Sequence, residues 1–211
     1  MARPKGTRST NYDAKRAALL DEVERHLVHV APHRPSFREL AVACNVSLAT
    51  LRHYFGGRDG LMAAYLDRFG AGGLPYLDYL AATDLGFADS IRDATRFLLL
   101  GFTLPELGPR QAVALSEGLA EPATGQAYLR HILEPLIAAL AERLDRHVAR
   151  GEMRPANSRH VATQLISPLF LATLHQNQLG GKTAYPLDLA AFGDETAGAI
   201  IRAYAPDPDR P

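Results

Sequence analysis

Residues 36–55, SFRELAVACNVSLATLRHYF, constrain the fold of this chain more than any other stretch, because they predict two short helices joined by a tight turn. Ser36 followed three residues later by Glu39 forms a capping box, which marks a helix start. Ser47 predicts a second start, and Asn45 between the two helices is one of the few non-glycine residues that tolerate a left-handed backbone. The pattern is typical of a helix-turn-helix, although any helical hairpin with two good caps gives a similar one.

The second predicted helix cannot bury all of its sides. Its apolar positions, Leu51, Tyr54 and Phe55, recur at helical spacing and predict an inward face. The other side chains are small or able to form hydrogen bonds, which is what a helix in a DNA major groove requires. These outward residues are Leu48, Ala49, Thr50, Arg52 and His53.

The chain continues from Phe55 with a glycine turn, the basic residue Arg58 and the start of a new helix. The run VSLATLRHYFGGRDGLMAAYL resembles the DNA-binding domain of the TetR family of bacterial transcriptional regulators, and the resemblance covers about the first 65 residues. It implies an all-α fold of about nine helices, with an N-terminal three-helix helix-turn-helix domain and a C-terminal helical domain for ligand binding and dimerisation. It also implies a repressor that binds a palindromic operator in double-stranded DNA as a homodimer and is released by a small-molecule effector.

The resemblance assigns roles to individual residues. Arg38, Leu48 and Ala49 match base-facing positions, whereas Thr50, His53 and Tyr54 match positions at the DNA backbone. Arg58 stands where the family usually has a lysine and keeps a positive charge for a phosphate. Arg52 replaces a usual tyrosine, which leaves the operator sequence open, and Asn45 replaces the usual glycine of the turn. The predicted DNA-binding residues are Arg3, Lys5, Arg8, Ser36, Arg38, Ser47, Leu48, Ala49, Thr50, Arg52, His53, Tyr54 and Arg58.

The distribution of charge agrees with a basic DNA-binding head. Residues 1–60 hold ten Lys and Arg against six Asp and Glu, a net charge of +4, although the whole chain is neutral. We expect a disordered basic arm at 1–11, which either reaches the DNA or merely solubilises the protein. The DNA-binding domain is expected at 12–69, the helical body at 70–205 and a disordered tail at 206–211. Gly70, Gly72, Gly73 and Pro75 predict a flexible joint between the two domains.

The expected body consists of long helices, at 87–104, 109–119, 125–150, 158–179 and 187–204. An apolar and aromatic set with two polar members is a candidate ligand lining, or else ordinary core: Phe97, Phe102, Tyr128, His131, Phe170 and His175. The last two helices resemble the pair that forms a four-helix dimer interface in the family. Their candidate apolar seam, or else intramolecular core, is Leu165, Leu169, Ala172, Ala197, Ile200 and Ile201.

Several other classes of function find little support. Cys44 is the only cysteine, which excludes an intrachain disulfide and favours a reducing, cytoplasmic location. We expect no metal, no cofactor and no membrane segment, since the apolar run at 161–174 is too short to span a bilayer. A small helical enzyme is the remote alternative, because Glu117 and Glu121 lie at helical spacing but look like a helix end. A ligand-independent DNA-binding regulator or activator is the nearer alternative.

Overall fold

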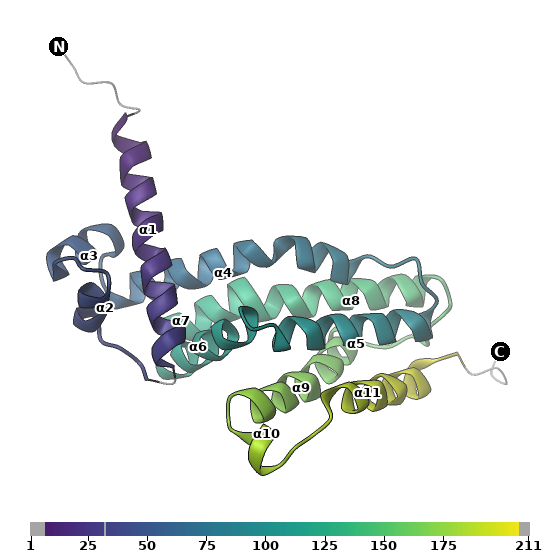
Figure 1. The fold of residues 1–211 in the computed structure, drawn as a ribbon. Helices are drawn as coiled ribbons and strands as arrows, with labels where there is room; N and C mark the ends of the chain where they lie inside the picture. The colour runs from purple at the N-terminus through teal and green to yellow at the C-terminus, as the bar shows by residue number, and fades with distance from the viewer. Residues whose placement is uncertain (1–6, 32, 207–211) are drawn as a thin grey trace. The chain divides into compact units, whose positions relative to one another are not determined.

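A computed structural model of the chain describes residues 7–31 and 33–206, with side chains from residue 11 onward. The described residues form eleven α-helices and one π-helical turn and contain no β-strand, so the expected all-α fold is confirmed while the helix number is somewhat larger (Figure 1). The elements are α1 (Thr7–Val30), α2 (Phe37–Ala43), α3 (Leu48–Phe55), α4 (Arg58–Ala81), α5 (Phe87–Thr103), α6 (Leu107–Ala120), α7 (Pro122–Tyr128), η1 (Leu129–Leu133), α8 (Glu134–Ala149), α9 (Ser158–Asn177), α10 (Gly181–Ala184) and α11 (Leu189–Tyr204).

The chain forms two compact units, and α4 and α6 contribute residues to both. The head unit comprises the residues up to Phe69 together with Val113–Tyr128. Apolar side chains from α1 to α4 are buried in it, because each of these helices carries an apolar stripe at helical spacing. They are Leu19, Leu20, Val23, Leu27, Leu40, Ala41, Leu51, Phe55, Leu61, Met62, Tyr65 and Leu66.

The start of α2 and the turn between α2 and α3 form as their residues predict. The Ser36 hydroxyl accepts from the Glu39 backbone N–H at 3.2 Å, and the Glu39 carboxylate accepts from the Ser36 backbone N–H at 2.7 Å. Asn45 has a φ of 52°, the left-handed conformation that its short polar side chain tolerates. One capping box and one left-handed residue therefore fix the start of α2 and the turn that follows it.

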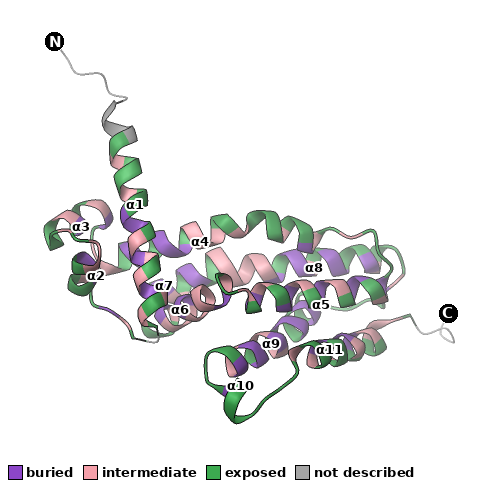
Figure 2. Cartoon of the chain, viewed as in Figure 1, coloured by how far each residue is buried: buried purple, intermediate pink, exposed green. Residues whose placement is uncertain are grey.

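The body unit comprises Gly70–Ala112 and the residues from Leu129 onward. Its core lies among α5, α8, α9 and α11, whose buried apolar side chains belong to one cluster (Figure 2). The Arg143 side chain on α8 is also buried. It donates to the backbone carbonyls of Tyr79, Leu80 and Ala82 at the end of α4.

Three expectations about element boundaries are wrong. α1 begins at Thr7, so residues 7–11 are helical. They contain no helix breaker and precede a well-packed helix. Residues 1–6 and 207–211 lie outside the described part of the chain. α4 continues to Ala81 through Gly70, because a single glycine costs only about 1 kcal/mol in a helix, and through Pro75, which removes one helical hydrogen bond without ending the helix. The helix expected at 125–150 is divided by the π-helical turn η1, and Pro135 lies in the first turn of α8, where a proline costs nothing.

Candidate DNA-binding surface

α3 presents a polar face outward because its apolar residues point into the head unit. Leu51 and Phe55 are buried, whereas Ala49, Arg52 and His53 are exposed and Leu48 is 36% exposed (Figure 2). Four of the five predicted outward positions of α3 are therefore exposed, and Thr50 is half-buried.

The first turn of α3 is held by its cap. The Ser47 hydroxyl accepts from the Thr50 backbone N–H at 3.0 Å, and the two hydroxyl oxygens are 2.8 Å apart. The next backbone N–H groups, of Leu48 and Ala49, have no partner within the helix, since no turn precedes them. A helix start of this kind attracts an anion such as a phosphate.

α1 supports the other end of α3 through aromatic contacts. The ring of Tyr12 lies 4.7 Å from the ring of Tyr54 and 5.8 Å, edge to face, from that of His53. The Arg16 guanidinium lies 5.1 Å from the centre of the Phe55 ring. Tyr12 and Arg16 thus position the α3 residues, and sequence reasoning missed both because their contacts are more than thirty residues away along the chain.

The remaining predicted DNA-binding residues differ in their surroundings. Ser36 is exposed, but its hydroxyl is engaged in the capping box. Arg38 is exposed on α2, beside a shallow groove that it lines with His26, Val30 and Val42. Arg3 and Lys5 lie outside the described residues, and Arg8 is described only as part of the α1 backbone.

At the start of α4, Arg58 pairs with a buried carboxylate. Its guanidinium donates to both oxygens of Glu117 at 2.8 Å and, through Nε, to the Pro35 carbonyl at 3.3 Å. Glu117 also accepts from Arg34 at 3.1 Å and is 2% exposed. Burial raises the pKa of the Glu117 carboxyl, but the hydrogen bonds from Arg58 and Arg34 outweigh it and hold the pKa below its usual value. Sequence reasoning noticed Glu117 only as part of a helix end.

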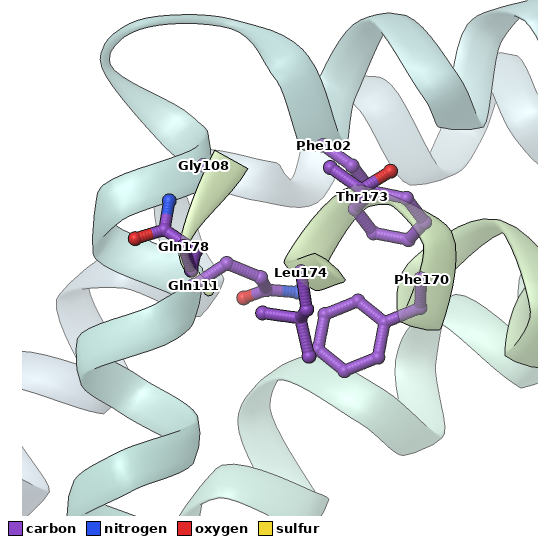
Figure 3. Close-up of a pocket in the computed structure, with 7 residues that line it drawn as sticks. All are labelled: Phe102, Gly108, Gln111, Phe170, Thr173, Leu174 and Gln178. Carbon is purple, nitrogen blue, oxygen red and sulfur yellow. The ribbon is translucent and has the colours of Figure 1, made fainter. Parts of the chain in front are cut away.

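The six candidate ligand-lining residues do not come together. Phe102 and Phe170 meet edge to face at 5.3 Å beside a cavity of about 10 Å³, which Gly108, Gln111, Thr173, Leu174 and Gln178 complete (Figure 3). Phe97 instead lies against Tyr76 and Tyr79.

The other three members of that set lie in separate places. Tyr128 is buried in the head unit, where burial raises the pKa of its hydroxyl to about 12. His131 lies in η1, and His175 lies 2.7 Å from the Gln176 amide. Helical periodicity alone identified these as inward-facing residues and did not indicate which unit they would enter.

The candidate dimer seam lies largely inside the single chain. Leu165, Leu169 and Ala172 of α9 and Ala197 and Ile200 of α11 are buried, and Ile201 is half-buried. These residues are ordinary intramolecular core, because α9 and α11 pack their apolar faces on α5 and on each other.

Two further properties concern only the described residues. Within residues 7–31 and 33–206, no group of three His, Cys, Asp or Glu side chains is arranged to hold a metal ion. In the same ranges, no helix combines the length and the apolar character needed to cross a bilayer.

Several solved structures with a similar architecture are described as transcriptional regulators. A TetR transcription regulator from Haloarcula marismortui ATCC 43049 matches 92% of this chain and 100% of its own, with a TM-score of 0.71 and 16% sequence identity. This chain has the TetR-family regulator fold. The flavonoid-responsive regulator FrrA (TM-score 0.66, 18% identity, 92% of this chain and 98% of its own) shares this TetR-family fold. The SmeT–triclosan complex does so as well (TM-score 0.66, 16% identity, 92% and 93%).

The TetR-family fold is recognised here from structure. No protein-family model and no curated protein matches the sequence. The described helix-turn-helix, α2 and α3, carries the motif on which the sequence resemblance to TetR regulators depends.

Proposed function

We propose that this protein is a transcriptional repressor that binds a palindromic DNA operator as a homodimer. The observation that carries the proposal is the outward face of α3, where Leu48, Ala49, Arg52 and His53 are exposed next to the uncapped N–H groups of the helix start. These side chains are of the kinds that contact thymine methyl groups, base edges and phosphates in a major groove. The TetR-family fold supports a DNA-binding regulator.

A homodimer follows from the small footprint of one helix-turn-helix. A single recognition helix reaches few bases, so specificity requires two copies on half-sites about 34 Å apart. The exposed sides of α9 and α11 are the surface we assign to the partner. Leu171 on α9 is 65% exposed, and the exposed Ala191 and Ala199 on α11 permit close approach of another helix.

Release by a small molecule is the second part of the proposal. FrrA is flavonoid-responsive and SmeT forms a complex with triclosan, which supports an apolar or aromatic effector. The Phe102–Phe170 cavity offers aromatic walls, but about 10 Å³ holds only a water-sized group. A drug-sized effector needs roughly 300–1,000 Å³. An effector must therefore select a more open conformation, and it acts only through its higher affinity for that state.

The test of DNA binding uses the chain's own upstream region. Fluorescence anisotropy with palindromic fragments from that region, over a series of salt concentrations, measures affinity and its salt dependence. We expect tighter binding to one fragment than to bulk DNA and an affinity that falls as salt rises. The T50A/R52A variant should stay folded and bind at least about tenfold more weakly, because it loses contacts to base edges or phosphates.

The matched control is T103A/R92A, which removes the same two residue types from exposed positions on α5. It should bind the operator as the original protein does. If no upstream or genomic fragment is bound above bulk DNA, the proposed function is wrong.

A ligand-independent regulator is the second candidate, and the small size of the described cavity favours it. Triclosan and a flavonoid, added at increasing concentration to the protein–operator complex, separate the two. Release at concentrations that leave the protein folded supports the effector mechanism. Unchanged operator affinity, together with an unchanged Tm, supports the second candidate.

A further inference from the structure

A buried carboxylate in the head unit holds two arginines that flank the helix-turn-helix. Glu117, on the part of α6 that belongs to this unit, is 2% exposed. Its Oε1 accepts from Arg58 at 2.8 Å, and its Oε2 accepts from Arg58 at 2.8 Å and from Arg34 at 3.1 Å. Both oxygens are thereby used, and the carboxylate faces two positive charges.

The two arginines that Glu117 binds lie on either side of the helix-turn-helix in the chain. Arg34 lies between α1 and α2, just before the chain enters the helix-turn-helix, and Arg58 is the first residue of α4, just after the chain leaves it. The Arg58 Nε also donates to the carbonyl of Pro35, next to Arg34, at 3.3 Å. One carboxylate therefore fixes both ends of the segment that carries α2 and α3.

The geometry leaves Arg58 poorly suited to a DNA phosphate. All three of its guanidinium nitrogens donate within the protein, and the side chain is 21% exposed. Moving Arg58 to a phosphate would leave Glu117 buried with Arg34 as its one remaining partner, and a buried charge that loses its partners is costly. Arg52, by contrast, is exposed on α3.

We propose that Glu117 is a positioning residue for DNA binding. Through Arg34 and Arg58 it fixes both ends of the helix-turn-helix and so sets how α3 is presented, and Arg58 is its partner instead of a phosphate contact. This inference rests on the proposed DNA binding. According to this inference, α6 binds the two ends of the DNA-binding segment directly through Glu117.

The test is a double-mutant cycle of operator affinity with E117Q, R58Q and the double variant, measured over a series of salt concentrations. We expect each single variant to bind about tenfold more weakly and the double variant no more weakly than either, because one interaction is lost in all three. R58Q should keep the salt slope of the original protein, whereas removing a phosphate contact reduces its magnitude by about 0.9. E117D, which restores the charge, should recover part of the affinity that E117Q loses.

The matched control is E121Q, which removes a carboxylate from an exposed position four residues further along the chain. It should leave affinity unchanged. Circular dichroism at the assay temperature establishes that each variant is folded, and R34Q, which removes only one hydrogen bond of the cluster, replaces E117Q if that variant is unfolded. Hydrogen exchange within the folded proteins should be faster at residues 36–58 in E117Q and unchanged on α8.

Three results would each overturn the proposal. Tighter operator binding by E117Q means that Glu117 competes with DNA for the arginines. A reduced salt slope in R58Q means that Arg58 contacts a phosphate, and unchanged affinity in E117Q means that the cluster positions nothing. If the original protein binds no operator, the proposed function fails, and unchanged hydrogen exchange at 36–58 in E117Q then separately refutes the hold on the helix-turn-helix.

Discussion

Replacing Arg143 by methionine should destabilise the body unit far more than any surface change on the same helix. The Arg143 side chain is buried, at 1% exposure of the residue, and donates to four backbone carbonyls and to the Ser90 hydroxyl and the Asp93 carboxylate. Tyr79 and Leu80 lie in the last turn of α4, Ala82 follows the end of that helix, and Ser90 lies in α5. Methionine fills most of the same volume and supplies no donor.

The magnitude follows from the groups left without a partner. The buried carbonyl of Leu80, in the last turn of α4, is bonded to Arg143 at 2.7 Å and has no following helical donor, and the Asp93 carboxylate loses its buried cation. The Ser90 carbonyl, bonded at 2.9 Å, keeps its helical hydrogen bond within α5. Each buried acceptor left unsatisfied costs about 1–3 kcal/mol. The carbonyls of Tyr79 and Ala82 are partly exposed and regain water, so their loss adds little. We expect the free energy of unfolding to fall by about 3–5 kcal/mol, or Tm by about 10 °C for a chain of this length.

Urea unfolding followed by circular dichroism measures this loss, and R146M is the matched control. Arg146 lies three residues further along α8, is half exposed and pairs with Glu142 at 2.7 Å. Such a surface pair contributes less than about 1 kcal/mol. If R143M loses no more stability than R146M, the buried hydrogen bonds of Arg143 do not stabilise the fold and the reasoning fails.

Predictions at four further positions are measured by the same unfolding assay. N45A should lose about 1–2 kcal/mol because alanine resists the left-handed backbone at φ 52°, whereas N45G should be close to neutral. G72A should gain about 1 kcal/mol, since its new methyl group points into open space within α4, whereas G60A should lose stability because its methyl group would lie 2.1 Å from the Phe55 carbonyl oxygen. Burial lowers the pKa of His147 despite its hydrogen bond to Glu152, and Arg150 and Arg143 lower it further. As pH falls, the unfolded chain therefore takes up a proton at His147 before the folded protein does. The contribution of His147 to stability should be complete above pH 6.5, the ordinary histidine pKa, and decrease below it. The decrease should be smaller in H147Q. Equal stability of the original protein at pH 8 and pH 5.5 would contradict the His147 prediction.

The helix-turn-helix could be predicted from the sequence because its determinants are local. Ser36 with Glu39, Ser47 with Thr50, and Asn45 in the turn each act within three residues of one another or alone. Such short-range chemistry determines helix starts and turns whatever the rest of the chain does. The exposed face of α3 then followed from the positions of Leu51 and Phe55.

The residues that hold the fold together could not be predicted in this way. Glu117 meets Arg58 and Arg34 across 59 and 83 residues, and Arg143 reaches Leu80 across 63. From the sequence, a charged residue in a helix is expected to face solvent. Only the tertiary packing shows that Glu117 and Arg143 are buried with partners. The candidate dimer seam on α9 and α11 could not be assigned for the same reason. Periodicity identifies an apolar face, but it does not indicate whether that face packs within the same chain or against a second copy.

Glu117 and Arg143, both buried charged residues, each bind a different end of α4. α4 is 24 residues long and contributes to both units. Its first residue, Arg58, is bound by Glu117 from α6, and its last turn is bound by Arg143 from α8. A cation at the carboxyl end of a helix also complements the helix dipole. Glu117 in the head unit and Arg143 in the body unit therefore each satisfy hydrogen-bonding groups at one end of α4, although neither could be paired with that end from sequence spacing.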